Sequence, residues 1–296
     1  RRQARDTIPP SGRAGKQPMA LNHDLHSHSI YSDGVLAPRA LLERAKANGV
    51  HVLALTDHDD VSGLREAAEA AQDLGIRFVP GVEISATWGG VTIHVVGLGI
   101  DFENETLLAG LAHVRGSRER RARKIAAELE RIGIEGSLEG AYAYAENPQL
   151  ISRTHFARFL VSRGYASDVK SVFQHYLVPG KPGYVAHEWC TIAEAVSWIR
   201  ASGGQPVIAH PGRYKLSRDE MTQMLAEFKE AGGVGIEVVT GSHAPEQYEE
   251  YAQRAREFEL LASRGSDFHA PGEARVDVGR LPELPRDLRP VWHDWD

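Results

Sequence analysis

Short apolar runs alternate with helix-like stretches along most of the chain, and this alternation constrains the fold more than any other feature. The apolar runs lie near residues 22–28, 51–57, 77–84 and 91–98, and again at 205–210, 234–239 and 260–266. Helical patterns separate them at 37–48, 62–74, 217–231 and 245–258, with Ser62 expected to start the second helix. Seven strands in such an α/β pattern predict an incomplete, TIM-like (β/α)7 barrel of parallel βα units.

A helical segment interrupts the alternation between residues 101 and 204. Residues 104–133 predict one long helix or two shorter ones, and further helices are expected near 154–163, 168–177 and 191–202. We therefore expect a barrel made of residues 19–100 and 205–296. Residues 101–204 form a helical insertion in this prediction, and it acts as a substrate lid.

Composition limits the class of protein. A chain of 296 residues with 42% hydrophobic content can bury a core as one barrel-sized domain or two smaller ones. Cys190 is the only cysteine, so intrachain disulfides and thiolate metal sites are excluded and a reducing cytoplasm is the expected compartment. The longest apolar runs are too short to span a membrane, so no membrane association is expected.

The first 18 residues have the composition of a disordered leader. They carry five cations, one carboxylate and three prolines, with no aromatic residue. Met19 is the expected natural start. Without this leader the net charge moves from −6 to −10, which disfavours DNA and long nucleic acids as partners.

Histidines and carboxylates stand at or just after the expected strand ends. Alternate residues of a strand face the same side, so His26 and His28 in Asp24-Leu-His-Ser-His28 point the same way, as do Asp267 and His269. Every strand except the sixth contributes to this set, which also includes Asp33, His58, Glu83, His94 and His210. Barrel loops meet at the carboxyl ends of the strands, so we expect a polynuclear metal site there. The alternative is a barrel that keeps these residues for folding alone.

These motifs, in this order, resemble the PHP (polymerase and histidinol phosphatase) family over residues 22 to about 285. Family members hold two or three divalent ions in a distorted seven-stranded barrel. The resemblance implies nine ligands for three ions. His26, His28, Glu83 and Asp267 would bind the first, Asp33, His58 and His269 the second, and His94 and His210, bridged by Glu83, the third.

Nitrogen and oxygen ligands without sulfur suit Mn²⁺, Fe²⁺ or Zn²⁺, and Mn²⁺ is our first expectation. Three such ions outweigh the three carboxylates, so the surplus charge should attract a phosphate, and a metal-bound hydroxide should attack it. Asp33, His58 and His210 are the catalytic candidates, and the general acid stays open between Asp33 and His210. Asp57 either positions a ligand or caps the next turn.

The insertion is rich in cations. Residues 115–124 hold six of them on an expected helix, and Arg115 and Arg118 can present guanidiniums to one ligand, unless this helix face is simply solvated. Arg153 and His155 flank a helix start where Thr154 is the expected N-cap, which favours an anion site over ordinary capping. Lys181 lies in Pro179-Gly-Lys-Pro-Gly-Tyr184, which is either a closing loop or a plain connector. His243 is expected to be a loop residue and not a ligand.

The insertion motifs, with Ala209-His-Pro-Gly-Arg-Tyr214 and the segment that follows Ser266, closely resemble the 3′,5′-nucleotide bisphosphate phosphatase branch of this family. That resemblance implies hydrolysis of the 3′-phosphate of nucleoside 3′,5′-bisphosphates to nucleoside 5′-monophosphates. The alternatives are a 5′-to-3′ exoribonuclease for short 5′-phosphorylated RNA, a histidinol phosphatase, and a non-catalytic scaffold. Neither the oligomeric state nor the base preference follows from the sequence.

Overall fold

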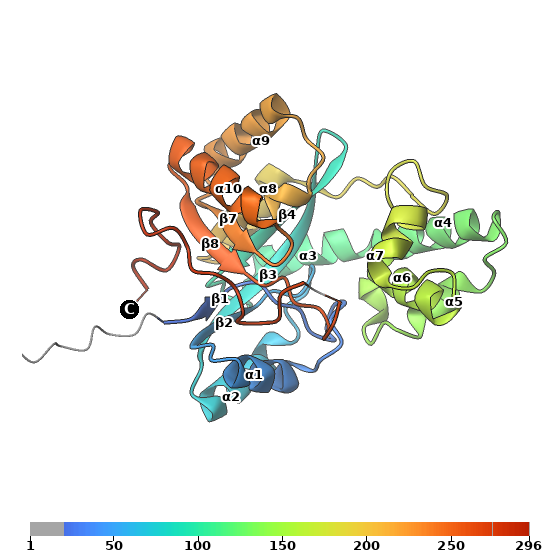
Figure 1. Ribbon diagram of the computed structural model, residues 1–296, viewed down its shortest axis with the longest axis horizontal. Helices are drawn as coiled ribbons and strands as arrows, with labels where there is room; N and C mark the ends of the chain where they lie inside the picture. The colour runs from blue at the N-terminus through green and yellow to red at the C-terminus, as the bar shows by residue number, and fades with distance from the viewer. Residues whose placement is uncertain (1–20, 274, 296) are drawn as a thin grey trace, which may run out of the picture.

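A computed structural model describes residues 21–273 and 275–295, so the expected leader and Met19 lie outside the described residues. Its strands follow the order β1-β2-β3-β4-β6-β7-β8 in one sheet (Figure 1). Leu25 N donates to Arg264 O at 3.0 Å and joins the two ends of the sheet. The strands are β1 (His23–Asp24), β2 (Val52–Leu55), β3 (Arg77–Trp88), β4 (Val91–Leu98), β6 (Gln205–Ile208), β7 (Gly235–Thr240) and β8 (Leu261–Gly265). The predicted seven-stranded, barrel-like α/β fold is confirmed.

The prediction of purely parallel pairing is wrong for one strand, because β4 is antiparallel to both β3 and β6. Only Gly89 and Gly90 connect β3 to β4, and their φ angles of 55° and 76° fit a tight hairpin turn. A parallel connection needs a dozen or more residues, so this link permits only a hairpin. The reversal brings the start of β4, and with it His94, to the end of the barrel where the other strands finish.

Helices cover the outside of the barrel. They are α1 (Pro38–Ala47), α2 (Leu64–Leu74), α3 (Glu105–Arg115), α8 (Ile192–Ala201), α9 (Arg218–Glu230) and α10 (Pro245–Glu257). Gly75 ends α2 in the left-handed conformation at φ 64°, which favours glycine. The expectation that this helix starts at Ser62 is wrong, because it starts at Leu64 with Gly63 as its N-cap. Glycine has no side-chain oxygen, so no side chain caps the helix start.

The interior of the barrel is apolar below the strand ends. Leu25, Ala54, Val96 and Val207 are among the inward-facing residues of this cluster, and all are at most 1% exposed. The C-terminal segment adds Val291, Trp292 and Trp295 to it. Aromatic side chains from the end of the chain therefore pack against the inside of the barrel, on the side away from the insertion (Figure 1).

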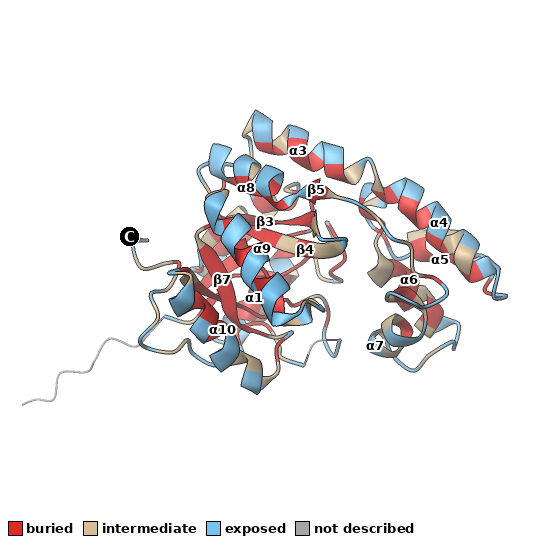
Figure 2. Ribbon diagram, turned by 90° about the horizontal axis from the view of Figure 1, so that it is seen from above, coloured by how far each residue is buried: buried red, intermediate tan, exposed pale blue. Residues whose placement is uncertain are grey.

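Four helices, α4 (Arg118–Glu130), α5 (Ser137–Tyr142), α6 (Arg153–Ser162) and α7 (Val169–Val172), gather beside the barrel (Figure 2). A π-helical turn at Phe173–Leu177, a two-residue β5 (Cys190–Thr191) and 3₁₀ turns at Pro148–Leu150 and Pro211–Arg213 complete the elements. Helices α4 to α7 have a hydrophobic core of their own around Phe156 and Leu129. By contrast, α3 and α8 contribute to the main core, so the separately packed unit is narrower than the predicted 101–204. Of the two alternatives for residues 104–133, the structure has the two shorter helices, α3 and α4, and it adds α5 after them.

Among the described residues, no helix has the length and apolar character needed to cross a bilayer.

Candidate metal and anion site

All nine predicted ligand residues lie together at one end of the barrel. β3 and β4 carry Glu83 and His94 within their length, whereas the others lie in the loops that follow their strands. The side chains form a continuous chain of short contacts: the Nε2 atoms of His26 and His28 lie 3.1 Å apart, and each lies 3.3 Å from Glu83 Oε2. Two of the residues, His210 and Asp267, have positive φ angles of 27° and 55°. Such strained backbone is typical of functional sites.

Three groups of these side chains bring their ligand atoms within 4.8 Å of one another. The first is the predicted set of His26, His28, Glu83 and Asp267. The second contains the predicted Asp33, His58 and His269, together with His28. The third joins His58, Glu83 and His94, while the expected His210 lies beside it, with Nε2 2.8 Å from Glu83 Oε1.

The hydrogen bonding of the three carboxylates fits cation binding. Glu83 Oε1 contacts His94 Nδ1 at 2.7 Å, Asp267 Oδ2 accepts from Ser242 Oγ at 2.6 Å, and Asp33 Oδ2 accepts from Ser152 Oγ at 3.3 Å. The second oxygen of each carboxylate is buried and accepts no hydrogen bond from the described residues, and its nearest neighbours are imidazole nitrogens 2.9 to 3.4 Å away. A buried carboxylate oxygen is costly unless it is paired. Three such oxygens, surrounded by imidazoles, suit divalent ions.

The electrostatics of the cluster also call for positive charge. Burial alone would raise the pKa of Glu83, but His94, His58 and His26 outweigh burial and hold this pKa well below its usual value. Burial would lower the pKa of His28, but its contacts with Asp267 and Glu83 raise it to about 10. The carboxylates therefore stabilise cationic neighbours, which a metal ion can replace.

Glu237 on β7 is a functional candidate that the sequence reasoning missed, and it corrects the expectation that the sixth strand contributes nothing. Its Oε1 lies 2.7 Å from His26 Nδ1, and its Oε2 accepts from His210 N at 2.6 Å. With Nδ1 donating to this carboxylate, His26 directs the lone pair of Nε2 towards Glu83. A single acidic residue inside the apolar run Gly235–Thr240 was the available signal.

Asp57 supports the loop that carries His28 and Asp33. It accepts from Ser29 N at 2.8 Å and from the hydroxyls of Ser29 and Ser32 at 2.6 Å. The Ser32 hydroxyl also lies 3.5 Å from His28 Nδ1. Asp57 thus organises the loop between β1 and α1, and the alternative of capping the turn after β2 is wrong.

Four arginine side chains line one pocket together with several of the predicted metal ligands. Asp33, His58, His94 and His269 line the pocket on the barrel side, and Arg118, Arg121, Arg153 and Arg213 line it on the other sides. Trp189 lies 5.0 and 5.2 Å from the Cζ atoms of Arg118 and Arg121, and Phe173 lies 5.5 Å from that of Arg153. These aromatic contacts hold the guanidiniums in place.

Two of these arginines carry charge that no carboxylate balances. Among the described residues Arg121 makes no hydrogen bond or ion pair, and Arg153 donates only to Leu177 O, at 3.2 Å. Burial, followed by repulsion from Arg153 and Arg118, lowers the pKa of Arg121 to about 9. Burial and repulsion from Arg213 likewise lower the pKa of Arg153 to about 10. A bound anion would relieve both effects.

The predicted substrate-binding residues divide into two groups. Arg118 and Arg153 line the pocket as expected. Arg115 does not, because its guanidinium donates to Asp59 O at 2.6 Å on the barrel. Lys181 is exposed outside the pocket lining. Arg121 and Arg213 take these places instead, and both stood within motifs that the sequence had drawn attention to.

The start of α6 also differs from the prediction. Ser152, not Thr154, is the N-cap, and its hydroxyl accepts from Thr154 N. His155 is buried and accepts from Ser152 N at 3.0 Å through Nδ1, so it completes the cap instead of lining the pocket. Burial lowers the pKa of His155 to about 4 and keeps the ring neutral.

Two histidines after the later strands have different surroundings. His210, a catalytic candidate, is 1% exposed and lies behind the residues that line the pocket, whereas Asp33 and His58 line it directly. His243 accepts from Gly212 N at 2.9 Å and is absent from the three ligand groups found among the described residues, in line with the expectation of a loop residue.

A model of the PHP domain family matches residues 24–257, which include seven of the nine ligand positions in addition to most of the barrel. The chain belongs to the PHP domain family. It is 50% identical over 273 residues to a 3′,5′-nucleoside bisphosphate phosphatase of Chromobacterium violaceum, covering 92% of this chain and 96% of that protein. It is 43% identical over 279 residues to the 5′-3′ exoribonuclease Rnm of Escherichia coli, covering 94% of each.

Two solved structures have the same architecture. An amidohydrolase from Chromobacterium violaceum, solved with bound sulfate and no metal, superposes with a TM-score of 0.89 at 50% identity, covering 92% of this chain and 95% of that one. A protein from Bifidobacterium adolescentis described as a metal-dependent phosphoesterase superposes with a TM-score of 0.77 at 29% identity, covering 93% and 94%. These likenesses extend over the barrel and the helical insertion together.

Proposed function

We propose that this PHP-family enzyme is a metal-dependent phosphatase that hydrolyses the 3′-phosphate of nucleoside 3′,5′-bisphosphates to nucleoside 5′-monophosphates. One observation carries the proposal: the ligand cluster and the unbalanced Arg121 and Arg153 face each other across a single pocket. A substrate with two phosphates satisfies both sides. The similar Chromobacterium violaceum phosphatase, at 50% identity over nearly the full length of both chains, supports this substrate class.

The chain's own residues divide the work between the two phosphates. Arg121 and Arg153 would bind the 5′-phosphate, since charged hydrogen bonds from guanidiniums are strong and directional. Arg118 is held by Asp59 and stacks on Trp189, so it contributes positive potential from a fixed position. Arg213 donates to Asp267 Oδ2 at 3.0 Å and reaches the pocket beside the ligands, where it would stabilise the phosphate that is removed.

The nine predicted ligand residues would hold three metal ions, and we expect these ions to be Mn²⁺. When bound, such ions activate water as a nucleophile and screen the charge that develops on the phosphoryl group. One oxygen of Asp33 accepts a hydrogen bond from Ser152, and the other lies 3.2 Å from His269 Nε2 at the pocket wall. Of the two candidates for the general acid, only Asp33 lines the pocket. Burial would raise its pKa, but His269 and His58 outweigh burial and hold this pKa well below its usual value, so Asp33 would serve as a metal ligand and not as the proton donor. The enzyme would act in the cytoplasm.

The test is phosphate release by Mn²⁺-loaded protein from adenosine 3′,5′-bisphosphate, with the product identified by chromatography. AMP should form, and 3′-AMP and histidinol phosphate should be cleaved much more slowly. The proposal is wrong if either of those monophosphates is the better substrate. Metal analysis of protein purified without chelators would count the ions, and full activity in a metal-free sample would refute the metal requirement.

A second candidate function is 5′-to-3′ exonucleolytic trimming of short RNA. The observation that favours it is a row of exposed cations on α4, where Arg120 and Lys124 extend the basic surface beyond the pocket. Together with Arg121 and Arg118 they add to the effect of burial and lower the pKa of His187 to about 4. The 43% identity to the Escherichia coli exoribonuclease supports this candidate. Release of mononucleotides from a 5′-phosphorylated oligomer, compared with bisphosphate hydrolysis in one assay, would separate the two.

A further inference from the structure

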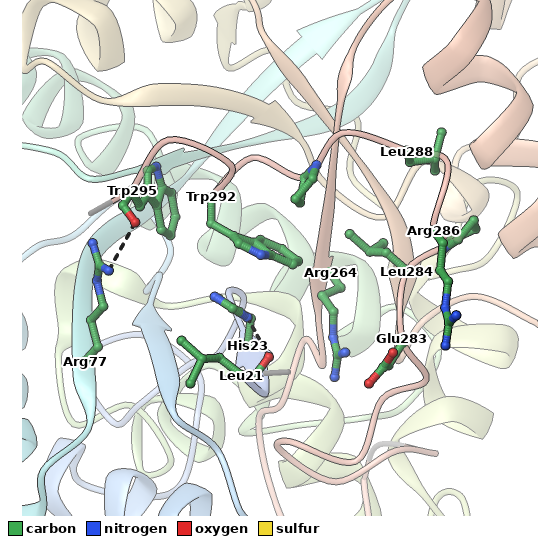
Figure 3. A pocket seen from close by; sticks show the side chains of 12 residues that line it. Leu21, His23, Arg77, Arg264, Glu283, Leu284, Arg286, Leu288, Trp292 and Trp295 are labelled. Carbon is green, nitrogen blue, oxygen red and sulfur yellow. Dashed lines mark hydrogen bonds between the residues drawn. The ribbon is translucent and has the colours of Figure 1, made fainter. Parts of the chain in front are cut away.

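A second cavity, of about 490 Å³, opens at the amino-terminal end of the barrel, where β1 and β3 begin. The C-terminal segment forms one side of it, and β8 contributes Arg264 (Figure 3). Metal ligands lie at the opposite ends of the strands, so this cavity is separate from the candidate active site. Its volume is in the range of pockets that bind small organic molecules.

Aromatic rings form the first part of the lining. The indole of Trp292 stacks on the imidazole of His23, with ring centroids 4.1 Å apart and planes 12° from parallel. Trp295 lies beside them, and its Nε1 donates to Gln205 Oε1 at 3.2 Å. Because Trp292 and Trp295 also pack against the inner core of the barrel, their positions are set by the fold. Ordered indoles at a cavity wall suit a flat aromatic ligand.

Cations form the second part. Figure 3 shows Arg77 near Trp295 and, across the cavity, Arg264 and Arg286 on either side of Glu283. Burial lowers the pKa of His23 to about 4, so its ring is neutral near pH 7. The positive charges of Arg264 and Arg77 act in the same direction as burial, whereas the bond to Leu21 O acts against it. On this side of the cavity the two guanidiniums of Arg264 and Arg286 outnumber the one carboxylate of Glu283.

Arg264 is the most informative of these residues. Its side chain is buried, at 5% exposure. Its Nη2 donates to Asn22 Oδ1 at 2.9 Å and to Leu281 O at 3.1 Å. Its Nε has no hydrogen-bond partner among the described residues. Its guanidinium makes no direct ion pair with a described residue, and Asp24 and Glu283 are the acidic groups that act on it from a distance. A buried guanidinium that meets only neutral oxygens gains from an anion.

We propose that this cavity binds an anionic small molecule that carries a flat aromatic ring, independently of the candidate active site. The two indoles contact the ring and the guanidiniums contact the anionic group. Nucleotides and aromatic carboxylates share this chemistry.

Equilibrium dialysis of the full chain with AMP and, separately, with indole-3-acetate tests the proposal. Arg153→Glu removes AMP binding at the active site, and this variant should still bind one probe molecule per chain. Adding Arg286→Glu should weaken that binding by about tenfold, which is the loss of one modest charged contact. Arg289→Glu is the matched control, since it is an exposed arginine of the same segment outside the cavity lining, and it should leave binding unchanged.

Trp292→Leu provides a second variant that changes the ring contact and not the charge, with circular dichroism as the check on folding. Tighter binding of AMP would identify nucleotides as the ligands, and tighter binding of indole-3-acetate would identify aromatic carboxylates. The proposal is overturned if the Arg153→Glu chain binds neither probe, or if Arg289→Glu weakens binding as much as Arg286→Glu. Phosphate release, measured in parallel, tests the proposed enzyme activity separately.

Discussion

Replacing Glu237 with glutamine should weaken metal binding while leaving the fold intact. Glu237 is 1% exposed and accepts two hydrogen bonds, from His26 Nδ1 at 2.7 Å and from His210 N at 2.6 Å. A glutamine has the same shape but only one terminal oxygen, so one of these two donors must face an amide N–H. The variant therefore loses one of the two contacts that orient His26 and His210.

The size of the effect follows from the lost contact. A hydrogen bond to a charged group contributes about 1.5–3 kcal/mol. If that energy serves to orient the metal ligands, the affinity for Mn²⁺ should fall by roughly 10- to 100-fold, the range seen when groups that hold metal ligands are removed. Activity at limiting Mn²⁺ should fall accordingly, and excess Mn²⁺ should restore most of it.

Competition with a metal-binding dye measures the affinity, and thermal unfolding of the metal-free protein measures stability. Glu230→Gln is the matched control, because Glu230 is an exposed residue near the end of α9 and carries the same charge. The reasoning is refuted if Glu237→Gln keeps the native Mn²⁺ affinity. It is equally refuted if the variant loses activity that no excess of Mn²⁺ restores while the metal-free protein unfolds at a much lower temperature.

Three further predictions concern the insertion and the acid stability of the barrel. Arg153→Ala should raise KM for adenosine 3′,5′-bisphosphate by roughly 10- to 100-fold but change KM little for an aryl phosphate, and Arg115→Ala should shift neither; equal effects on both substrates would remove Arg153 from the substrate site. Glu273→Gln should break the two-pronged ion pair with Arg158 (3.0 and 2.9 Å), which ties α6 to the loop after β8, and should speed amide hydrogen exchange in α6; unchanged exchange there would contradict it. His23, whose folded pKa of about 4 lies below 6.5, stabilises the fold above pH 6.5, and this stabilisation is lost as pH falls from 6.5 towards 4. His23→Phe should therefore flatten urea-measured stability across that window by on the order of 2 kcal/mol, and an unchanged slope would contradict the assignment.

The positions of strands and ligands were predictable because each is encoded locally. His26 and His28 share a face through the two-residue period of an extended chain, whatever the rest of the molecule does. The direction of β4 was also encoded, in the two glycines between Trp88 and Val91, but the expectation of repeated βα units obscured it. Glu237 gave a weaker signal, since an acidic residue in an apolar strand has no local partner to reveal its role.

The arginines of the insertion were not predictable in the same way. Arg115 and Arg121 belong to one cationic run, yet Arg115 bonds to the barrel at Asp59 O while Arg121 faces the pocket, where no described residue makes a hydrogen bond or ion pair with it. The break between α3 and α4 separates them, and it gives each helix its own orientation. A count of charges along the chain carries no information about that orientation.

The sequence by itself determined the chemistry of the site, because ligand identity and strand period are local properties of the chain. The tertiary structure alone decided which cations meet the ligands and which residue supports His26, because those contacts join segments that are far apart in the sequence. Arg213 meets Asp267 across 54 residues, and Asp33 meets Ser152 and His26 meets Glu237 across more than a hundred, only after the barrel closes and the insertion packs on it. The same closure brings Trp292 onto His23 and creates the cavity at the other end of the barrel.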